Sequence, residues 1–192
     1  MTLTEHSGKS SAIDISAVAI TPGTVTDAAE LAEFAVHSFV ETYAADNDPV
    51  NLEAHLSANY GPKQQAAELA DPLVTTILAR SNGELVAYAQ VRRSVTPPCV
   101  VHGDPIELHR FYVDHRAHGS GLASELMHAV HQAAHELEGR HIWLGVWEQN
   151  PRAIAFYKKV GFVDVGSQIY KVGPDEQADR VLVVSVHDQG PN

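Results

Sequence analysis

The chain has 192 residues, of which 44% are hydrophobic and 19% charged, as in a single globular domain and unlike a disordered, collagen-like or coiled-coil protein. The 13 basic and 24 acidic residues leave a net charge of −11, so nucleic acid is not an expected partner, because phosphates require a basic face. A single cysteine, Cys99, allows no intrachain disulfide. With no bilayer-spanning apolar run and no signal-peptide pattern, we expect a cytoplasmic protein without a membrane partner. Its expected assembly is a homodimer, the commonest one for soluble proteins.

The first half of the chain is expected to hold a tail, three strands and three helices. Residues 1–14 are rich in Ser, Thr and Gly and predict a flexible tail, which leaves residues 15–192 as a single domain. Apolar residues at helical spacing mark a first helix with Thr26 as its N-cap. The segment Ser81-Asn82-Gly83 is a strong hairpin signal. The predicted ranges are strands at 16–20, 74–79 and 84–92 and helices at 24–43, 49–57 and 63–70.

The second half alternates strands and helices, which favours a mixed α/β fold around one sheet. The segment 141–147 is almost continuously apolar, as expected for a strand covered on both faces. The predicted ranges are strands at 106–113, 141–147, 162–167 and 180–186 and helices at 122–137 and 150–160.

A glycine turn between a strand and a helix is the most informative motif. Arg116-Ala117-His118-Gly119-Ser120-Gly121-Leu122-Ala123 follows the strand at 106–113 and opens the long helix. Free N–H groups and the helix dipole at such a turn form an anion site suited to a diphosphate. The P-loop sequence is absent, and the late position of the turn fits a dinucleotide fingerprint poorly. A tight connection without a ligand remains an alternative on the glycines alone.

A second motif follows the strand at 141–147. Asn150, Ala153, Tyr157 and Gly161-Phe162 occur in an order and spacing that, together with Arg116, Gly119 and Gly121, resemble the GCN5-related N-acetyltransferase (GNAT) superfamily. Within it, segments 38–43, 143–159 and 173–179 look like bacterial PaiA-type spermidine/spermine N-acetyltransferases. The resemblance implies one twisted mixed sheet of about six to seven strands, flanked by helices and splayed at the fourth and fifth strands, with coenzyme A (CoA) in the gap.

The resemblance also implies roles for individual residues. Tyr157 matches the phenol that protonates the leaving thiolate, and Glu107 and His109 lie on the strand where a general base would act. A backbone N–H near Phe111 to Val113 would polarise the thioester carbonyl. The expected contacts of acetyl-CoA are Phe111, Tyr112, Val113, Arg116, His118, Gly119, Ser120, Gly121, Leu122, Ala123, Asn150, Ala153, Tyr157 and Lys159.

Each role has a plain structural alternative. Tyr157 could be a core tyrosine, Asn150 an N-cap, Arg116 a solvated loop residue, and Glu107 and His109 ordinary strand residues. The expected function is acetyl transfer from acetyl-CoA to a small primary amine, with a polyamine as one candidate. Protein N-termini and amine antibiotics are alternative acceptors, and a non-catalytic acyl-CoA-binding module or a nucleotide-dependent oxidoreductase are alternative classes.

Other features of the sequence point less directly to a function. His109 replaces an acid typical of the PaiA-like group, and the loop 96–104 is extended, so both bear on the acceptor. No metal site is expected: His128, His131 and His135 are interpreted as a solvated helix face. Trp143 and Trp147 share a strand face as core or groove wall, and Cys99 is interpreted as a bystander. Loop acids Asp46 and Asp48 could attract a cation or simply precede a helix.

Overall fold

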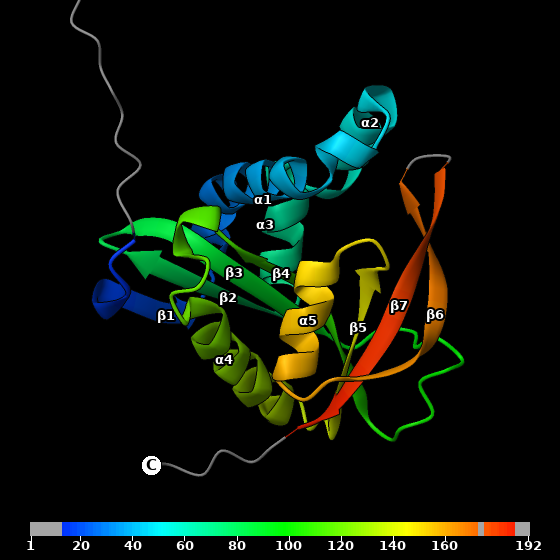
Figure 1. Ribbon diagram of the computed structural model, residues 1–192. Helices are drawn as coiled ribbons and strands as arrows, with labels where there is room; N and C mark the ends of the chain where they lie inside the picture. Colours follow the sequence, from blue (N-terminus) through cyan, green and yellow to red (C-terminus); the bar gives the residue numbers. More distant parts are fainter. Residues whose placement is uncertain (1–12, 173–174, 187–192) are drawn as a thin grey trace, which may run out of the picture.

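A seven-stranded sheet organises the molecule (Figure 1). The structure is a computed structural model that describes residues 13–172 and 175–186. The sheet order is β1-β2-β3-β4-β5-β7-β6, and every described pair of neighbours is antiparallel except β4 and β5. The strands are β1 (Val18–Pro22), β2 (Val74–Ser81), β3 (Glu84–Arg92), β4 (Pro105–Val113), β5 (His141–Trp147), β6 (Val163–Val172) and β7 (Asp175–Ser185).

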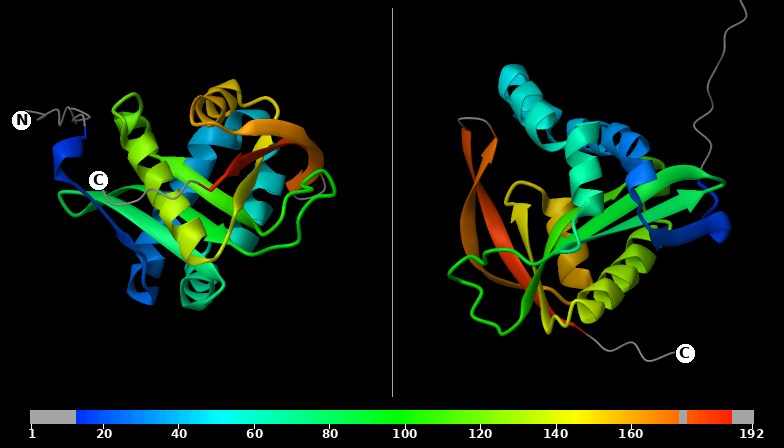
Figure 2. Two further views of the ribbon diagram at one scale, coloured as in Figure 1. Left: turned by 90° about the horizontal axis from the view of Figure 1, so that it is seen from below. Right: turned by 180° about the vertical axis from the view of Figure 1, so that it is seen from behind.

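Helices cover both faces of the sheet (Figure 2). On one face, α4 and α5 contribute Leu126, Val130 and Tyr157 to the larger apolar core. On the other, α1 and α2 contribute Leu31 and Leu52 to a second core. Burial on both faces explains the apolar sequence of β5. The helices are α1 (Ala28–Tyr43), α2 (Pro49–Asn59), α3 (Pro62–Ala70), α4 (Leu122–Glu136) and α5 (Pro151–Lys159), with 3-10 turns η1 (Ile15–Ala17), η2 (Val25–Asp27), η3 (Ala44–Asp46) and η4 (His115–Ala117).

The parallel pair at the centre of the sheet comes apart after three residues. Pro105, Ile106 and Glu107 of β4 pair with residues 141–143 of β5, and the described ladder contains no pairing between these strands beyond them. From there β4 continues beside β3 and β5 beside β7. The predicted α/β sheet with a splay between the fourth and fifth strands is therefore confirmed.

A β-bulge in β4 sets which side chains face the splay. The register between β3 and β4 shifts at His109, because Leu108 pairs with Val91 and Arg110 with the adjacent Gln90. The extra residue in β4 has no partner of its own on β3. Side chains that follow it therefore point to the opposite face of the sheet from the one that simple alternation along the strand would give. Buried Leu108 therefore belongs to the α4 core, whereas Arg110 points toward the helices of the opposite face.

The N-terminal boundaries differ from the prediction for local reasons. Asp14 accepts hydrogen bonds from the backbone and hydroxyl of Ser16, which holds η1 where a strand was predicted. Thr26 is not the N-cap of the first helix. Thr24 N–H instead donates to Asp27 at 2.7 Å and starts η2, from which α1 follows. Most of the predicted tail, residues 1–12, lies outside the described residues.

The C-terminal hairpin is longer than predicted. Strands β6 and β7 pair over Val163–Val172 and Asp175–Ser185, well beyond the predicted 162–167 and 180–186. Its outer half carries polar side chains, so hydrophobic periodicity could not detect it. Gly173 and Pro174, part of the PaiA-like segment 173–179, lie outside the described residues.

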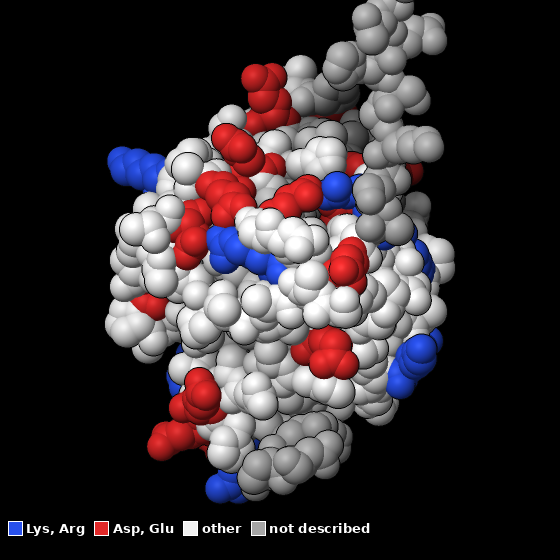
Figure 3. Space-filling view, turned by 90° about the vertical axis from the view of Figure 1, so that its left-hand side faces the viewer, with Lys and Arg blue, Asp and Glu red and all other residues white. Residues whose placement is uncertain are grey.

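The surface agrees with the acidic composition. On the face drawn in Figure 3, carboxylate side chains are more prominent than basic ones. None of the described helices is long and apolar enough to cross a membrane. The expected solvated histidine face of α4 is wrong for His131, which is buried near Met127 and Ala134, while His128 and His135 are exposed.

Candidate active site

The separation of β4 and β5 opens a cavity of about 480 Å³. The three predicted catalytic residues, Glu107, His109 and Tyr157, all line it. Most predicted cofactor contacts line it as well: Phe111, Tyr112, Val113, His118, Gly119, Gly121, Ala123, Asn150 and Ala153. Arg116, Ser120, Leu122 and Lys159 do not.

The glycine turn presents unpaired amides to this cavity. Gly119 and Gly121 adopt φ angles of +79° and +100°, which residues with a side chain rarely adopt. Among the described contacts, the N–H groups of Gly119, Gly121 and Ala123 have no protein acceptor. A Cβ at either glycine would meet nothing within 4 Å, so this surface is open. Such amides at the start of α4 can hold an anion.

Two arginines lie near the turn, and of these Arg152 lines the cavity whereas Arg116 does not. Arg116 binds Asp114 through Nε and Nη2 and also contacts Glu84 at 2.6 Å, so its charge is already paired. Arg152, in the first turn of α5, donates to His118 Nδ1 at 3.0 Å, and both residues line the cavity. Arg152 is not among the predicted cofactor contacts, although its position directly after Asn150-Pro151 is a usable signal.

Asn150 and Tyr157 belong to one short helix that covers the gap. The Asn150 side chain accepts from Ala153 N–H at 3.1 Å and caps α5, so the N-cap interpretation holds, and the side chain also lines the cavity. Tyr157 is buried among Phe111, Phe156 and Phe162. Burial raises the pKa of its phenol well above the ordinary value, so the hydroxyl stays protonated at neutral pH.

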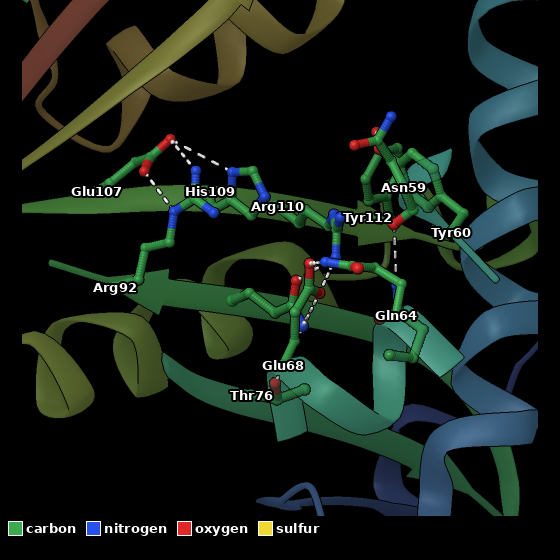
Figure 4. A network of polar contacts seen from close by, with 12 residues as sticks. Asn59, Tyr60, Gln64, Glu68, Thr76, Arg92, Glu107, His109, Arg110 and Tyr112 are labelled. Atoms are coloured by element: carbon green, nitrogen blue, oxygen red, sulfur yellow. Dashed lines mark hydrogen bonds and ion pairs between the residues drawn. The ribbon is translucent and has the colours of Figure 1, made fainter. Parts of the chain in front are cut away.

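An ion-paired carboxylate and a histidine face the cavity from β4 (Figure 4). Arg92 Nε donates to Glu107 Oε2 at 2.6 Å, and His109 Nδ1 lies 3.3 Å from Oε1. Burial opposes ionisation of Glu107, but hydrogen bonds from His109 and Arg92 prevail and lower its pKa to about 2. Burial lowers the pKa of His109 despite the raising effect of Glu107, so the imidazole is neutral at pH 7. Sequence reasoning missed Arg92, which lies on a different strand.

A second buried ion pair joins Arg110, which lines the cavity, to Glu68 (Figure 4). Arg110 binds Glu68 of α3, donates to Gln90 at 2.7 Å, and lies 4.6 Å from the ring centre of Tyr60. It also donates to the carbonyl of Asn59 at 2.9 Å. This network joins α2 and α3 to β4 and fixes the wall of the cavity.

Several other residues have structural surroundings. Asp48 caps α2 by accepting from the N–H groups of Val50 and Asn51, which supports its structural interpretation. Cys99 of the extended loop packs against the cluster that contains Trp143, whereas Trp147 lines the cavity. Within residues 13–172 and 175–186, no cluster of His, Cys, Asp or Glu side chains is arranged to hold a metal.

Comparison with known proteins identifies the family. Residues 28–162 match the Acetyltransferase (GNAT) family. The chain belongs to this family. An uncharacterized N-acetyltransferase of Mycobacterium tuberculosis is 32% identical over 161 residues, which cover 83% of this chain and 97% of that protein. The N-alpha-acetyltransferase RimI of the same organism is 36% identical over 119 residues, covering 60% of this chain and 70% of RimI.

Solved structures agree with this assignment at the level of the fold. The PaiA N-acetyltransferase of Thermoplasma acidophilum, in complex with coenzyme A, superposes with a TM-score of 0.71 at 17% identity, over 88% of this chain and 98% of that one. The acetyltransferase YncA of Salmonella typhimurium, with acetyl-CoA, gives a TM-score of 0.62 at 17% identity, over 91% and 97% of the two chains. This GNAT protein is therefore an acyltransferase that uses acetyl-CoA as co-substrate and an amine as acceptor.

The geometry of this GNAT chain fits acetyl-CoA. The free amides of Gly119, Gly121 and Ala123 and the nearby Arg152 guanidinium suit a diphosphate, and the gap between β4 and β5 leaves backbone groups of both strands available to an extended arm. Arg116 matches the family motif, and its guanidinium is paired with the carboxylates of Asp114 and Glu84.

Proposed function

We propose that this protein transfers the acetyl group of acetyl-CoA directly to a primary amine of a small molecule, with polyamines such as spermidine as the first candidates. The observation that carries this proposal is that Tyr157 and the His109–Glu107 pair line the same cavity as the free amides of the glycine turn. A donor for the leaving group and an acceptor for the amine proton are thus available beside one anion site. The choice of a polyamine as first candidate rests on the resemblance of segments 38–43 and 143–159 to PaiA-type enzymes.

The cofactor side is held by the glycine turn. The amides of Gly119, Gly121 and Ala123 bind the diphosphate, with Arg152 adding charge at the mouth of the cavity. Acetyl-CoA supplies an activated acetyl thioester. Tyr157, protonated because burial raises its pKa, donates its proton to the sulfur that leaves.

The acceptor must be deprotonated before it can attack. A primary amine with a pKa of about 10.4 is protonated at neutral pH. Neutral His109 directs Nδ1–H toward the Glu107 carboxylate, which leaves the lone pair of Nε2 to take a proton directly or through one water. Glu107, with a pKa of about 2, is too weak a base itself, so it orients the imidazole.

The test is acetyl-CoA turnover, followed by thiol release, against spermidine, spermine, putrescine, an aminoglycoside and short peptides with free N-termini. We expect turnover with polyamines. Turnover with peptides alone would instead favour the N-terminal acetylation performed by RimI. Thermal stabilisation by acetyl-CoA without turnover of any acceptor would support a binding module, and stabilisation by NAD would support an oxidoreductase.

A further inference from the structure

We propose that Asp179 of β7 binds an ammonium group of the acceptor and makes the enzyme selective for amines that carry a second positive charge. This inference rests on the acetyl transfer proposed above. It assigns specificity to a residue outside the GNAT motifs, on a strand that contributes neither to the glycine turn nor to α5.

The sheet register places Asp179 in the cavity between two polar or aromatic neighbours. Asp179 pairs with Trp147 of β5 on one side and with Gln168 of β6 on the other. Directly opposed residues in antiparallel strands project to the same face of the sheet. All three residues line the cavity, so this cross-strand row forms part of its wall.

Gly145 supplies the room for this row. A Cβ at Gly145 would lie 2.9 Å from Asp179 Oδ2 and 2.5 Å from Gln168 Nε2. These two side chains therefore occupy the space above β5 that any larger residue would take. The carboxylate is held over the strand at the point where β5 has already separated from β4.

Asp179 differs from the other acids of the site in having no cationic partner. Glu107 is paired with Arg92 and Glu68 with Arg110. Asp179 is only 7% exposed, yet within the described part of the chain it forms no ion pair. A buried carboxylate without a counter-charge is costly, and burial accordingly raises the pKa of Asp179 to about 6, against one hydrogen bond from Gln168. A bound ammonium would supply the missing charge.

Aromatic rings next to Asp179 suit the rest of such a ligand. Tyr43 of α1 lies 6.0 Å from Trp147 and 4.6 Å from Phe39, measured between ring centres. These three residues line the cavity. A diamine consists of ammonium groups joined by methylene groups. The face of an aromatic ring attracts the former and packs against the latter. The face of Tyr60 is already taken by Arg110, whereas no described cation lies over the rings of Tyr43 and Trp147.

The groups facing Asp179 come from three elements. Tyr43 of α1 and Tyr170 of β6 both have their pKa raised, mainly by burial and in part by the Asp179 charge, so both are neutral at pH 7. His55 of α2 contacts Tyr170 at 3.3 Å, and burial and Arg110 lower the pKa of His55, so it is neutral as well. No charged side chain among these neighbours competes for the carboxylate.

The cofactor and Asp179 lie on different faces of the sheet. The glycine turn leads into α4 on one face, whereas Trp147 meets Tyr43 of α1 on the other. Two hydrogen bonds also tie the β6–β7 hairpin to this second face: Gln177 to Asn47 at 2.7 Å, and Asn51 to Asp175 at 2.9 Å. Acetyl-CoA and a charged acceptor can therefore approach the splay from opposite sides.

The experiment compares two acceptors that differ in one charge, putrescine and aminobutanol, in which a hydroxyl replaces the second ammonium. Binding to the protein–CoA complex is measured by calorimetry for the wild type, Asp179→Asn and the control Asp164→Asn. Asp164 is an exposed aspartate of β6 paired with Arg180, outside the cavity. We expect Asp179→Asn to weaken putrescine binding at least about 10-fold and aminobutanol binding no more than about threefold, with Asp164→Asn unchanged for both.

A second variant tests the same site while keeping the carboxylate. Gly145→Ala places a methyl group against the carboxylate and should weaken putrescine binding in preference to aminobutanol. The inference is overturned if putrescine binds Asp179→Asn as tightly as the wild type, or does not bind the wild type. Failure of acetyl transfer is distinguishable, because the wild type would then bind putrescine in an Asp179-dependent manner without releasing thiol.

Discussion

Arg92 and Glu107 form a bonded pair across neighbouring strands, with Arg92 Nε donating to the carboxylate at 2.6 Å. Glu107 is the last residue of β4 that pairs with β5, so the splay begins directly after this pair. Its effect reaches His109, because the carboxylate raises the pKa of the imidazole whereas the guanidinium lowers it. The two members of the pair therefore act on the proposed base with opposite sign.

Substitution of Arg92 and substitution of Glu107 should shift the acidic limb of the pH profile of kcat in opposite directions. Arg92→Gln removes a positive charge and raises the pKa of His109, so as the pH is lowered kcat should begin to fall at a higher pH than in the wild type. Glu107→Gln removes the stabilising carboxylate and moves the limb to a lower pH, with a reduced kcat because the ring loses its orientation. Each displacement should be about one pH unit.

The matched control is Arg140→Gln, which removes an exposed arginine paired with Asp104 away from the cavity. It should leave the profile unchanged. Profiles that move in the same direction for both active-site variants would show that His109 is not the titrating group.

Loss of the Tyr157 hydroxyl should affect turnover and not cofactor binding. Tyr157→Phe keeps the ring contacts with Phe111 and Phe162 and removes only the proton donor. We expect kcat to fall about 100-fold or more, while calorimetry gives an unchanged Kd for acetyl-CoA. A kcat close to that of the wild type would contradict the assignment of Tyr157 as the acid.

Alanine at the glycine turn should weaken acetyl-CoA binding beyond its effect on the fold. Gly119→Ala and Gly121→Ala force a side chain into positive φ at a cost of about 1–2 kcal/mol each. Gly83→Ala is the matched control, since Gly83 has φ +86° and equally open surroundings but lies in the β2–β3 turn. It should lower Tm similarly and leave the Kd for acetyl-CoA unchanged.

Substitution of Arg152 should affect acetyl-CoA binding, whereas substitution of Arg116 should affect the stability of the fold. Arg152→Gln should raise the KM for acetyl-CoA several-fold with little change in Tm, because its only described polar contact is with His118. Arg116→Gln leaves buried Asp114 without its main partner and should lower the free energy of unfolding by about 1–3 kcal/mol. Urea denaturation and steady-state kinetics on both variants check this. A raised KM for acetyl-CoA in Arg116→Gln and an unchanged KM in Arg152→Gln would indicate that Arg116 is the arginine that binds the diphosphate.

The elements that sequence reasoning placed well are those with strong local signals. The Ser81-Asn82-Gly83 turn, the amphipathic helix α4 and the apolar strand β5 are each encoded within a short window. The outer part of the β6–β7 hairpin was missed because alternate residues, such as Gln168, Gln177 and Asp179, are polar and line the cavity, while Ile169 on the other face is exposed. Such a pattern leaves no hydrophobic period to read.

The residues of the site also differ in whether a local sequence signal predicts them. The glycine turn and Tyr157 could be recognised because their positions are fixed by contiguous motifs. Arg92 and Asp179 could not, since their roles arise from β-sheet register and from the bulge at His109. A sequence pattern cannot tell which of 24 acidic residues lacks a counter-charge. The acceptor side is therefore where structure adds most.

The unpaired charge of Asp179 predicts a cost to the fold. Burial raises the pKa of this carboxyl from 3.8 to about 6. A raised carboxyl pKa means that the folded state holds its proton more tightly than the unfolded state. Stability is therefore greatest below pH 4 with respect to this group, and it is lost as pH rises through 6.

Asp179→Asn should accordingly stabilise the protein at pH 7, by about 1–3 kcal/mol, and the gain should disappear as pH falls to 4. Asp164→Asn should instead destabilise the protein at pH 7, because hydrogen bonds from Arg180 lower the pKa of Asp164 and so stabilise its charged form in the fold. Urea denaturation at the two pH values measures both. Putrescine, added with CoA, should raise the Tm of the wild type and not that of Asp179→Asn, since the ligand neutralises the same carboxylate whose burial is costly. A destabilised Asp179→Asn protein at pH 7 would mean that this aspartate is satisfied within the fold and is not held ready for a cation.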